Sequence, residues 1–383
     1  MTDNLNQYYT RNEFSDSLVN TISMNNPLIA LDLGFGSGDL LLAAKRRWRN
    51  ISLVGIDLDS KNVTEANEKK LIEAIHLDGF CLELPDYIRL NYGSVDLLLS
   101  NPPFYSKSID RNCREVLKKA GLEFCIGKNT KTIPAEIIFL AQNIRLLTEE
   151  GQIGIILPAG LLTGIRWRKL RKHIFENYKV NEIIQLPRNS FHKTEAETFI
   201  LNISMRKIDD FVYDIKITDY LSKSSIFIEK SCAILRADYS YHNKSHSTLP
   251  VYKNEDYKIF RGSLSNKSCS LKYKFHIHTS DLPVAPTEIY IPQFDEEHES
   301  FAKSGDILIA RVGTRCIGRI AFIKDGNAPV SDCVIVIRPK NLVIGQYLWS
   351  KISSSDGVEY ITNSALGVGA KYITQEYICR LLG

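Results

Sequence analysis

The sequence predicts an α/β protein whose first part forms a Rossmann-like, mostly parallel sheet and whose second part is mainly β. Two observations support this prediction. Up to about residue 205, short apolar runs typical of buried parallel strands alternate with segments of helical period. After about residue 230 the helical period fades, and short β-type runs lie among turn residues. We therefore expect two domains, at residues 1–235 and 236–383.

The apolar runs give the strands of the first domain, which we expect at residues 28–33, 51–56, 95–99, 153–157 and 180–186. Residues 62–74 and 135–147 repeat apolar side chains every three or four positions, which predicts helices. This alternation indicates parallel strands with helices on both faces of the sheet. Residues 198–205 and 211–218 are extended neighbours, and we expect them to pair as an antiparallel hairpin.

The second domain is predicted from shorter runs of β-forming residues. We expect its strands at residues 289–292, 306–312, 318–323 and 333–337. The polar stretch at residues 239–247 indicates a linker or loop near the boundary between the two domains. We therefore expect the second domain to form a sheet of its own and to be mainly β, within the α+β class.

The composition argues against membrane and secreted proteins. No apolar run reaches the roughly 18 residues that a membrane span needs, and the N-terminus lacks the pattern of a signal peptide. The eight cysteines are scattered singly, as in a reducing compartment. His276 and His278 with Cys269 lack a convincing fourth ligand, so alternation along a strand explains them better than a metal site. We therefore expect a cytoplasmic protein without metal and without a membrane partner.

Positive charge is concentrated in two short segments. The net charge is only +4, but residues 45–49 and 166–172 are dense in Lys and Arg and each contains a tryptophan. Such a cluster either binds nucleic acid or forms the solvated face of a helix. The sequence leaves both interpretations open.

A glycine-rich turn follows the first expected strand. It runs Asp32-Leu33-Gly34-Phe35-Gly36-Ser37-Gly38-Asp39 and leads into a helical segment. Glycine permits unusual backbone angles and a close approach of ligand to the main chain, and a helix N-terminus favours an anionic group. The turn alone fits NAD, FAD or S-adenosylmethionine. Asp32 either orients the turn or contacts the ammonium group of a cofactor.

Two further acidic residues end the next strands. Asp57 closes the second strand, where a carboxylate can accept hydrogen bonds from both hydroxyls of a ribose. Asp78 ends a third expected strand and can accept from the amino group of an adenine, with Phe80 as a stacking wall. Asp78 is otherwise an ordinary turn residue.

The most informative segment is Asn101-Pro102-Pro103-Phe104, which follows the strand at residues 95–99. Because proline lacks a backbone donor and fixes φ, this segment can continue neither a strand nor a helix. It holds an amide, a main-chain carbonyl and an aromatic ring at the carboxyl end of a strand, where α/β sheets bind ligands. Two acceptors beside a ring face suit an exocyclic amino group on a flat base.

In this order, the motifs resemble the amino-methyltransferases of bacterial restriction–modification systems that act on N6 of adenine in DNA. The resemblance covers roughly residues 8–205 and extends to Tyr8-Tyr9-Thr10, although Arg11 stands where the family usually has proline. In the γ group of these enzymes the cofactor motifs come first, the tetrapeptide follows, and target recognition comes last, which is the order seen in this chain. The resemblance implies S-adenosyl-L-methionine as cofactor, bound by Thr10, Asp32, Gly34, Gly36, Gly38, Asp57, Asp78 and Phe80.

The second domain has its own resemblance. Residues 303–314, 318–321 and 364–374 look like parts of a target-recognition domain of type I specificity subunits. The chain would then fuse a class I methyltransferase to a single recognition domain. This implies a site-specific DNA adenine-N6 methyltransferase of a restriction–modification or phage-defence system. Its partner would be double-stranded DNA, with a homodimer or a separate restriction subunit as further partners.

The resemblance also implies a mechanism. An adenine would be flipped out of the duplex, and Asn101 Oδ1 and the Pro102 carbonyl would accept its two N6 hydrogens. Phe104 would stack on the base, and residues 107–134 would close over it as a mobile loop. Phe191 either closes the edge of the base or is a core aromatic. Arg311 and Arg315, together with Arg319, either contact guanine or phosphate or are ordinary surface arginines.

Two alternatives stay open, one with the same fold and one from a different functional class. A methyltransferase acting on RNA or on protein glutamine shares the tetrapeptide and the first domain, but it does not require the second domain. A catalytically idle DNA-binding subunit would keep the fold in order to dock a partner. The intact residues Asn101, Gly36, Gly38 and Asp57 argue against an idle subunit.

Overall fold

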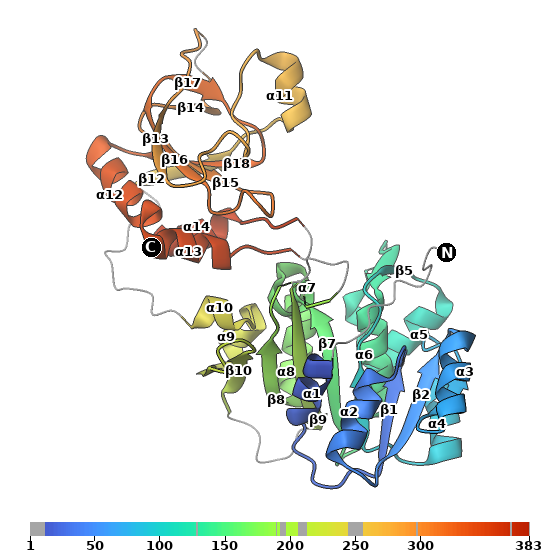
Figure 1. Ribbon diagram of the computed structural model, residues 1–383. Coiled ribbons are helices and arrows are strands. Elements are labelled where there is room, and N and C mark those ends of the chain that lie inside the picture. Colours follow the sequence, from blue (N-terminus) through green and yellow to red (C-terminus); the bar gives the residue numbers. More distant parts are fainter. Residues whose placement is uncertain are drawn as a thin grey trace. The chain divides into compact units, whose positions relative to one another are not determined.

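The computed structural model describes residues 12–127, 129–188, 190–191, 197–205, 213–243, 256–295, 298–367 and 370–382. The chain divides into two compact units, Met1–His242 and Asn243–Gly383, called unit 1 and unit 2 below (Figure 1).

Unit 1 is built on a nine-stranded sheet with the strand order β11-β10-β8-β9-β7-β4-β1-β2-β3. The strands are β1 Ile29–Leu33, β2 Ser52–Asp57, β3 Glu73–His76, β4 Leu97–Ser100, β7 Gln152–Pro158, β8 Tyr178–Gln185, β9 Thr198–Met205, β10 Ile215–Asp219 and β11 Ser225–Ile228. From β7 to β3 all neighbouring strands are parallel. β9 is antiparallel to both β7 and β8, so β7, β8 and β10 point in the same direction.

Helices cover both faces of this sheet. They are α1 Asn12–Asn20, α2 Asp39–Arg47, α3 Ser60–Lys69, α4 Leu84–Tyr92, α5 Arg111–Lys119, α6 Ala135–Leu146, α7 Ala159–Thr163, α8 Arg168–Asn177, α9 Lys230–Leu235 and α10 Tyr239–His242. Two 3-10 turns, η1 Glu123–Cys125 and η2 Ile165–Trp167, and a separate pair of strands, β5 Ser106–Ser108 and β6 Thr132–Pro134, complete unit 1.

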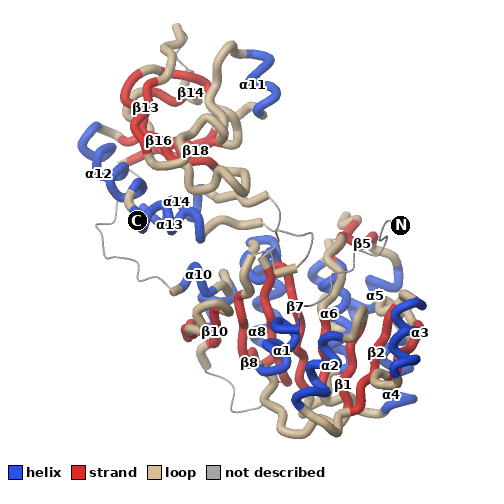
Figure 2. Tube along the Cα trace, viewed as in Figure 1, coloured by secondary structure: helices blue, strands red, loops and turns tan. Residues whose placement is uncertain are grey.

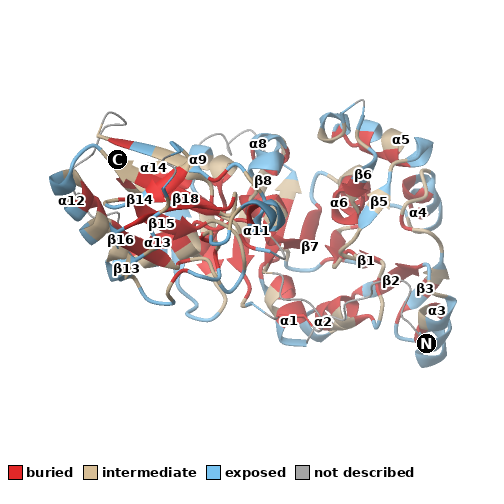
Figure 3. Cartoon of the chain, turned by 90° about the horizontal axis from the view of Figure 1, so that it is seen from above, coloured by how far each residue is buried: buried red, intermediate tan, exposed pale blue. Residues whose placement is uncertain are grey.

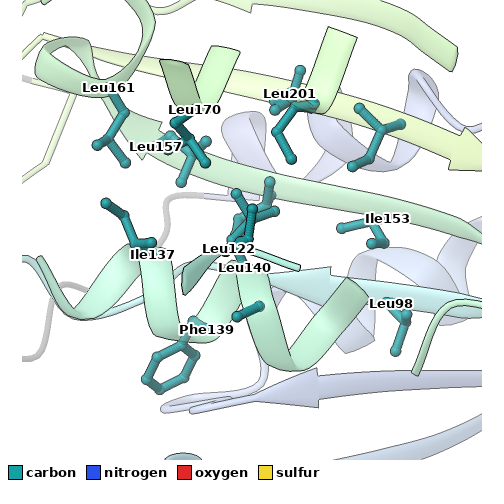
Figure 4. Packing of buried hydrophobic residues seen from close by; sticks show 14 of the residues in the cluster. Leu98, Leu122, Ile137, Phe139, Leu140, Ile153, Leu157, Leu161, Leu170 and Leu201 are labelled. Carbon is teal, nitrogen blue, oxygen red and sulfur yellow. The ribbon is translucent and has the colours of Figure 1, made fainter. Parts of the chain in front are cut away.

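The core of unit 1 lies in two clusters, one on each face of the sheet. α1, α2 and α3 contribute Leu18, Leu41 and Val63 to one cluster. α4, α5, α6 and α8 pack on the other face, where Ile137 and Leu140 of α6 lie against the sheet (Figure 4). The central strands β1, β4 and β7 are buried almost throughout (Figure 3), which is why their sequences are mainly apolar runs rather than alternating ones.

The structure confirms the α/β class and the five strands expected in the first domain, and it corrects two details. The helix expected at residues 62–74 ends at Lys69, because Lys70 adopts a left-handed conformation (φ 54°), and Glu73–His76 form β3. The expected hairpin of residues 198–205 and 211–218 is wrong. β9 lies between β7 and β8, and β10 pairs on the far side of β8. β9 is buried from Thr198 to Ile203, as a central strand must be.

Unit 2 is α+β, with strands and helices in similar amounts, so the expected dominance of strands is not seen (Figure 2). Its five-stranded sheet has the order β12-β18-β15-β16-β13, with β12 Tyr257–Arg261, β13 Thr287–Tyr290, β15 Ile307–Ala310, β16 Ile320–Asp325 and β18 Val334–Pro339. β14 Phe301–Lys303 pairs with β17 Asn327–Pro329. The helices are α11 Asn266–Lys272, α12 Leu342–Ser353, α13 Ser355–Asn363 and α14 Gln375–Leu382. Each strand expected in the second domain overlaps one of these strands.

The start of the expected linker is ordered structure. Tyr239–His242 form α10, and the backbone N–H of Ser240 donates to Gln185 Oε1 at 3.0 Å. Residues 244–247 lie outside the described part. No helix among the described residues could cross a membrane.

His276 and His278 do not lie in a strand; they flank an isolated bridge between Ile277 and Val330. His276 contacts Asn266, and His278 contacts Ser331. The described residues contain no cluster that could hold a metal ion.

Candidate functional site

Strands β1 to β4 end at one edge of the sheet, and a pocket opens there between their loops. Because the strands are parallel, residues far apart in the sequence meet at this edge. Of the residues expected to bind a cofactor, the pocket brings together Asp32, Gly34, Gly36, Asp57, Asp78 and Phe80. Asn101 and Pro103 of the tetrapeptide line the same pocket. Thr10 lies outside the described residues.

The glycine turn after β1 depends on backbone angles that favour glycine. Gly34, Gly36 and Gly38 have φ values of 77°, 56° and 82°. The Gly34 N–H donates to Ile56 O at 2.7 Å, which ties the turn to the neighbouring strand. Gly38 does not line the pocket, and a Cβ on it would lie 2.5 Å from Ile72 Cδ1. Gly38 therefore allows α2 to pack closely, while Gly34 and Gly36 face the pocket.

Asp57 organises the second loop of the pocket. Its Oδ2 accepts from the Gly36 N–H at 2.8 Å and from Asn62 Nδ2 at 3.3 Å, and its Oδ1 accepts from the Asp59 N–H at 2.8 Å. A carboxylate can accept roughly four hydrogen bonds, so these three leave room for one more donor. Asp57 can thus accept from one ribose hydroxyl while it holds the glycine turn in place.

Asp32 is a buried carboxyl group at the base of the pocket. It is 2% exposed, and its Oδ1 has no hydrogen-bond partner among the described residues. Burial, and then the charges of Asp57 and Asp39, raise the pKa of Asp32 well above its ordinary value. A buried carboxyl group without a partner is stabilised when a cationic donor binds beside it. The ammonium group of S-adenosylmethionine is such a donor, so the site fits this cofactor.

Aromatic side chains form the wall of the pocket near Asp78. The ring of Phe80 packs edge-on against Phe139 at 5.2 Å, and Lys107 Nζ lies 4.3 Å from the centre of the Phe80 ring. Asp78 Oδ1 accepts from the Phe80 N–H at 2.9 Å, which fixes the loop. A Cβ on Gly79 would come within 3.1 Å of the Phe139 ring. A Cβ on Gly34 would lie 3.2 Å from the same ring, so glycine at both positions leaves space for Phe139.

Phe139 and Tyr105 line the pocket but were not among the residues that the sequence indicated. Phe139 belongs to α6, which is apolar on nearly all sides, so its sequence does not show which face meets a ligand. Figure 4 shows Phe139 pointing away from the side of α6 on which Ile137 and Leu140 pack. Tyr105 directly follows the tetrapeptide, and this position is the only signal for it in the sequence.

The tetrapeptide leaves β4 at the edge of the pocket. Pro102 is buried, whereas Asn101, Pro103 and Phe104 are partly exposed. Phe104 packs edge-on against Phe191 at 6.2 Å. Phe191 is 2% exposed and belongs to the core of unit 1. In this structure Phe191 therefore supports the ring of Phe104 from behind.

Glu136 is a second buried carboxyl group near the tetrapeptide. It follows Ala135, whose N–H donates to Tyr105 O at 2.9 Å, and it lies one helical turn before Phe139 on α6. Glu136 is 4% exposed, and its Oε2 has no partner among the described residues. Burial raises the pKa of Glu136 to about 7. Nothing in the sequence pattern around Glu136 distinguishes it from an ordinary helix residue.

The segment expected to be a mobile loop at residues 107–134 has a structure of its own. β5 pairs with β6, and α5 buries Cys113, Val116 and Leu117 in the core. Lys128 lies outside the described residues.

The two basic clusters differ. At residues 45–49, Lys45 donates to Ile51 O, Arg46 pairs with Asp16, and Arg47 donates to Val19 O, so these cations stabilise unit 1. At residues 166–172 most of the cations are exposed, and only Arg171 is buried.

The arginines expected to contact DNA lie in unit 2. Arg311 Nε donates to Asp332 O at 2.9 Å, and Arg319 Nη1 donates to Leu282 O at 3.2 Å. These two side chains therefore hold loops of unit 2. Arg315 is exposed and makes no ion pair with a described residue.

With its parallel strands in this order and a glycine turn beside the pocket, unit 1 has the fold of S-adenosylmethionine-dependent methyltransferases. The sequence model described as N-6 DNA Methylase matches residues 2–243, which is more than half of the chain. The chain therefore belongs to the N-6 DNA methylase family. This confirms the family, the fold class and the cofactor that the sequence indicated.

Several known proteins are similar to the chain. The type II methyltransferase M.BanIII of Aneurinibacillus aneurinilyticus is 28% identical over 184 residues, which cover 43% of this chain and 31% of M.BanIII. The tRNA1(Val) (adenine(37)-N6)-methyltransferase of Flavobacterium johnsoniae is 26% identical, with 50% of this chain and 78% of that protein covered. The chain thus spans less than a third of the length of M.BanIII.

Among solved structures, the type IIG restriction endonuclease BpuSI is similar over 97% of this chain and 58% of its own, with a TM-score of 0.55 and 14% identity. At this level of identity the likeness shows a shared fold. It extends over both units of the chain.

Proposed function

We propose that the chain is a site-specific, adenine-specific DNA methyltransferase and the modification component of a restriction–modification system. One observation carries this proposal. Asn101 and Pro103 line the same pocket as Asp32, Asp57 and Asp78. The acceptors that suit an amino group thus lie beside the site that suits a methyl donor.

The proposed chemistry depends on position and hydrogen bonding. S-adenosylmethionine supplies a methyl group on a sulfonium, and Asp32, Asp57, Asp78 and the glycine turn would hold it. Asn101 Oδ1 and the Pro102 carbonyl would accept the two N6 hydrogens of adenine. When both N6 hydrogens are held by these acceptors, the lone pair of the nitrogen points toward the methyl group that is to be transferred. Such fixed acceptors contribute most where water is excluded.

The target base must leave the duplex, because stacking and pairing hide its amino group. Phe104 would stack on the extruded adenine, and its packing against Phe191 keeps the ring in one orientation. Unit 2 would supply target recognition. Its exposed Arg315 is a suitable donor to phosphate or to guanine.

Transfer of tritiated methyl groups to DNA tests the proposal. The wild-type chain should label duplex DNA from an unmodified host, and sequencing of the labelled DNA should place N6-methyladenine in one short motif. Asn101→Ala should lower the rate at least about 100-fold, as loss of a fixed polar group in an active site does. Its affinity for S-adenosylmethionine, measured by calorimetry, should stay within about threefold of wild type, since other residues carry that site.

Transfer RNA and release factor serve as competing substrates in the same assay. Labelling of either one, with none on duplex DNA, would contradict the proposal and favour the corresponding alternative. Full activity of Asn101→Ala would remove Asn101 from the chemistry.

A further inference from the structure

We infer that Ile165 is a wedge that enters the DNA duplex next to the target adenine and occupies the space that the extruded base leaves. Arg166 and Arg168 would bind the phosphates on either side. This inference rests on the proposed function, because only a substrate with a stacked, paired base needs such a residue.

The exposure of Ile165 is the first observation. Its side chain is 49% exposed, although Leu162 before it and Trp167 after it are 2% and 8% exposed. It forms η2 together with Arg166 and Trp167. The buried neighbours anchor this short turn in unit 1, so the apolar side chain between them is presented to the outside.

The location of the turn is the second observation. It follows β7 and α7, and β7 is the direct neighbour of β4, with Ser100 paired to Ile155. Both strands are parallel, so the chain leaves β7 at the same edge at which Asn101 leaves β4. In Figure 1, α7 lies at this edge of unit 1. Ile165 is thus on the side of β4 opposite the cofactor loops of β1, β2 and β3.

The rigidity of the turn is the third observation. Arg171 is 2% exposed, and its guanidinium donates to Leu161 O at 2.9 Å and to Gly164 O at 2.8 Å. The same group donates to Ile234 O at 3.0 Å and to Leu235 O at 2.7 Å in α9. A Cβ on Gly164 would overlap Gly160 O, so the backbone is closely packed here. A side chain that displaces a base must be held in this way, because a mobile one would fold aside.

The charge around Ile165 indicates the kind of partner. Arg166, Arg168 and Lys169 are exposed, and none of them pairs with a carboxylate among the described residues. The Arg166 guanidinium lies 4.7 Å from the Trp167 ring, which holds it beside Ile165. A single apolar side chain among free cations is too small a patch for a stable protein interface. It suits a polyanion with a stacked interior, which is duplex DNA.

The test compares Ile165→Ala with two control variants, Ile165→Leu and Leu28→Ala, on two duplexes. Ile165→Ala removes the wedge, and Leu28→Ala removes an aliphatic side chain that is 71% exposed at the start of β1, on the opposite edge of the sheet. One duplex carries the methylation site with a normal pair. The other has an abasic position opposite the target adenine, which already weakens pairing. Single-turnover methyl transfer is measured on both, with 2-aminopurine fluorescence at the target position as a direct report of extrusion.

The expected result is selective. Ile165→Ala should lower methyl transfer and the fluorescence rise on the paired duplex by about 10-fold or more, and the abasic duplex should restore both to within about threefold of wild type. Ile165→Leu should retain activity on both duplexes. Leu28→Ala should match wild type throughout. Cofactor affinity and melting temperature should not change in any variant.

Two results would overturn the wedge. They are full activity of Ile165→Ala on the paired duplex, and an equal loss on both duplexes, which would indicate a general role in DNA affinity or folding. If the wild-type chain methylates neither duplex, the proposed function itself fails and the wedge fails with it. The two failures are therefore distinguishable.

Discussion

The backbone N–H of Gly36 donates a hydrogen bond of 2.8 Å to Asp57 Oδ2. This bond links the glycine turn after β1 to the end of β2, so one carboxylate both shapes the turn and faces the pocket. Loss of the charge should therefore disturb two parts of the cofactor site at once.

Asp57→Asn should weaken S-adenosylmethionine binding by about 10-fold to 100-fold, because hydrogen bonds to an ionised group contribute about twice as much as neutral ones. Isothermal calorimetry measures this change. Asp59→Asn is the matched control: Asp59 caps α3 through the Lys61 N–H and does not line the pocket. Similar affinity losses for the two variants would contradict a direct role of Asp57.

Gly79→Ala should lower cofactor affinity through Phe139. The added Cβ would lie 3.1 Å from the ring, so the ring must shift in the wall of the pocket. We expect severalfold weaker binding and about 1–3 kcal/mol of lost stability, which is typical of overpacking. Gly93→Ala is the control: its Cβ would meet nothing within 4 Å, although its φ of 72° adds strain. This control should lose about 1–3 kcal/mol of stability, the range for a residue held at sparsely populated backbone angles, and no cofactor affinity.

Glu136→Gln should change how stability depends on pH. Burial raises the pKa of Glu136 from 4.5 to about 7 in the folded chain. Between these values the folded state binds more protons than the unfolded state, so the contribution of Glu136 to stability falls as pH rises towards 7. The total is about 3 kcal/mol, since one pKa unit corresponds to about 1.4 kcal/mol. Chemical denaturation between pH 5 and 8 should show a flatter profile for the variant than for wild type. Parallel profiles would contradict a raised pKa of Glu136 in the folded chain.

Asp238→Ala should destabilise unit 1. Arg236 Nε and Nη2 donate to Asp238 Oδ1 and Oδ2 at 2.6 and 2.8 Å, and the two side chains are only 4% and 3% exposed. Removing the carboxylate breaks this buried ion pair while the guanidinium stays buried, which costs about 3–5 kcal/mol. The double variant Arg236→Met/Asp238→Leu should recover much of this loss. Urea denaturation of the full chain measures both, and a double variant as unstable as the single one would refute the charge argument.

The sequence predicted the parts of the fold that depend on local pattern. β1, β2, β4 and β7 are mainly apolar runs because both faces of the sheet are covered, and such runs can be read directly from the sequence. The sequence pattern did not predict that β9 lies between β7 and β8, because apolar content alone does not show which strands pair with each other. A third strand before Asp78 was expected, but the helix expected at residues 62–74 overlapped its start, because a four-residue strand is too short to interrupt the preceding helical period.

The site was predictable to the same degree. Asp57, Asp78 and Asn101 follow strands and are unusual there, so their positions indicated function. Phe139 and Glu136 lie inside a helix whose other residues pack in the core, and only the fold shows that they approach the pocket or the tetrapeptide. The sequence did not decide whether Phe191 contacts the base or packs in the core. Its packing against Phe104 depends on contacts between distant segments.

The position of β9 has a consequence for engineering. β8 and β9 form a hairpin whose connection starts after Gln185 and returns at Thr198, and the Leu186 N–H closes it on Thr198 O at 3.0 Å. Because this latch fixes both ends, the cost of a longer connection grows only with the logarithm of its length. New residues can therefore be introduced into this connection, whose Phe191 packs against Phe104, without altering the sheet.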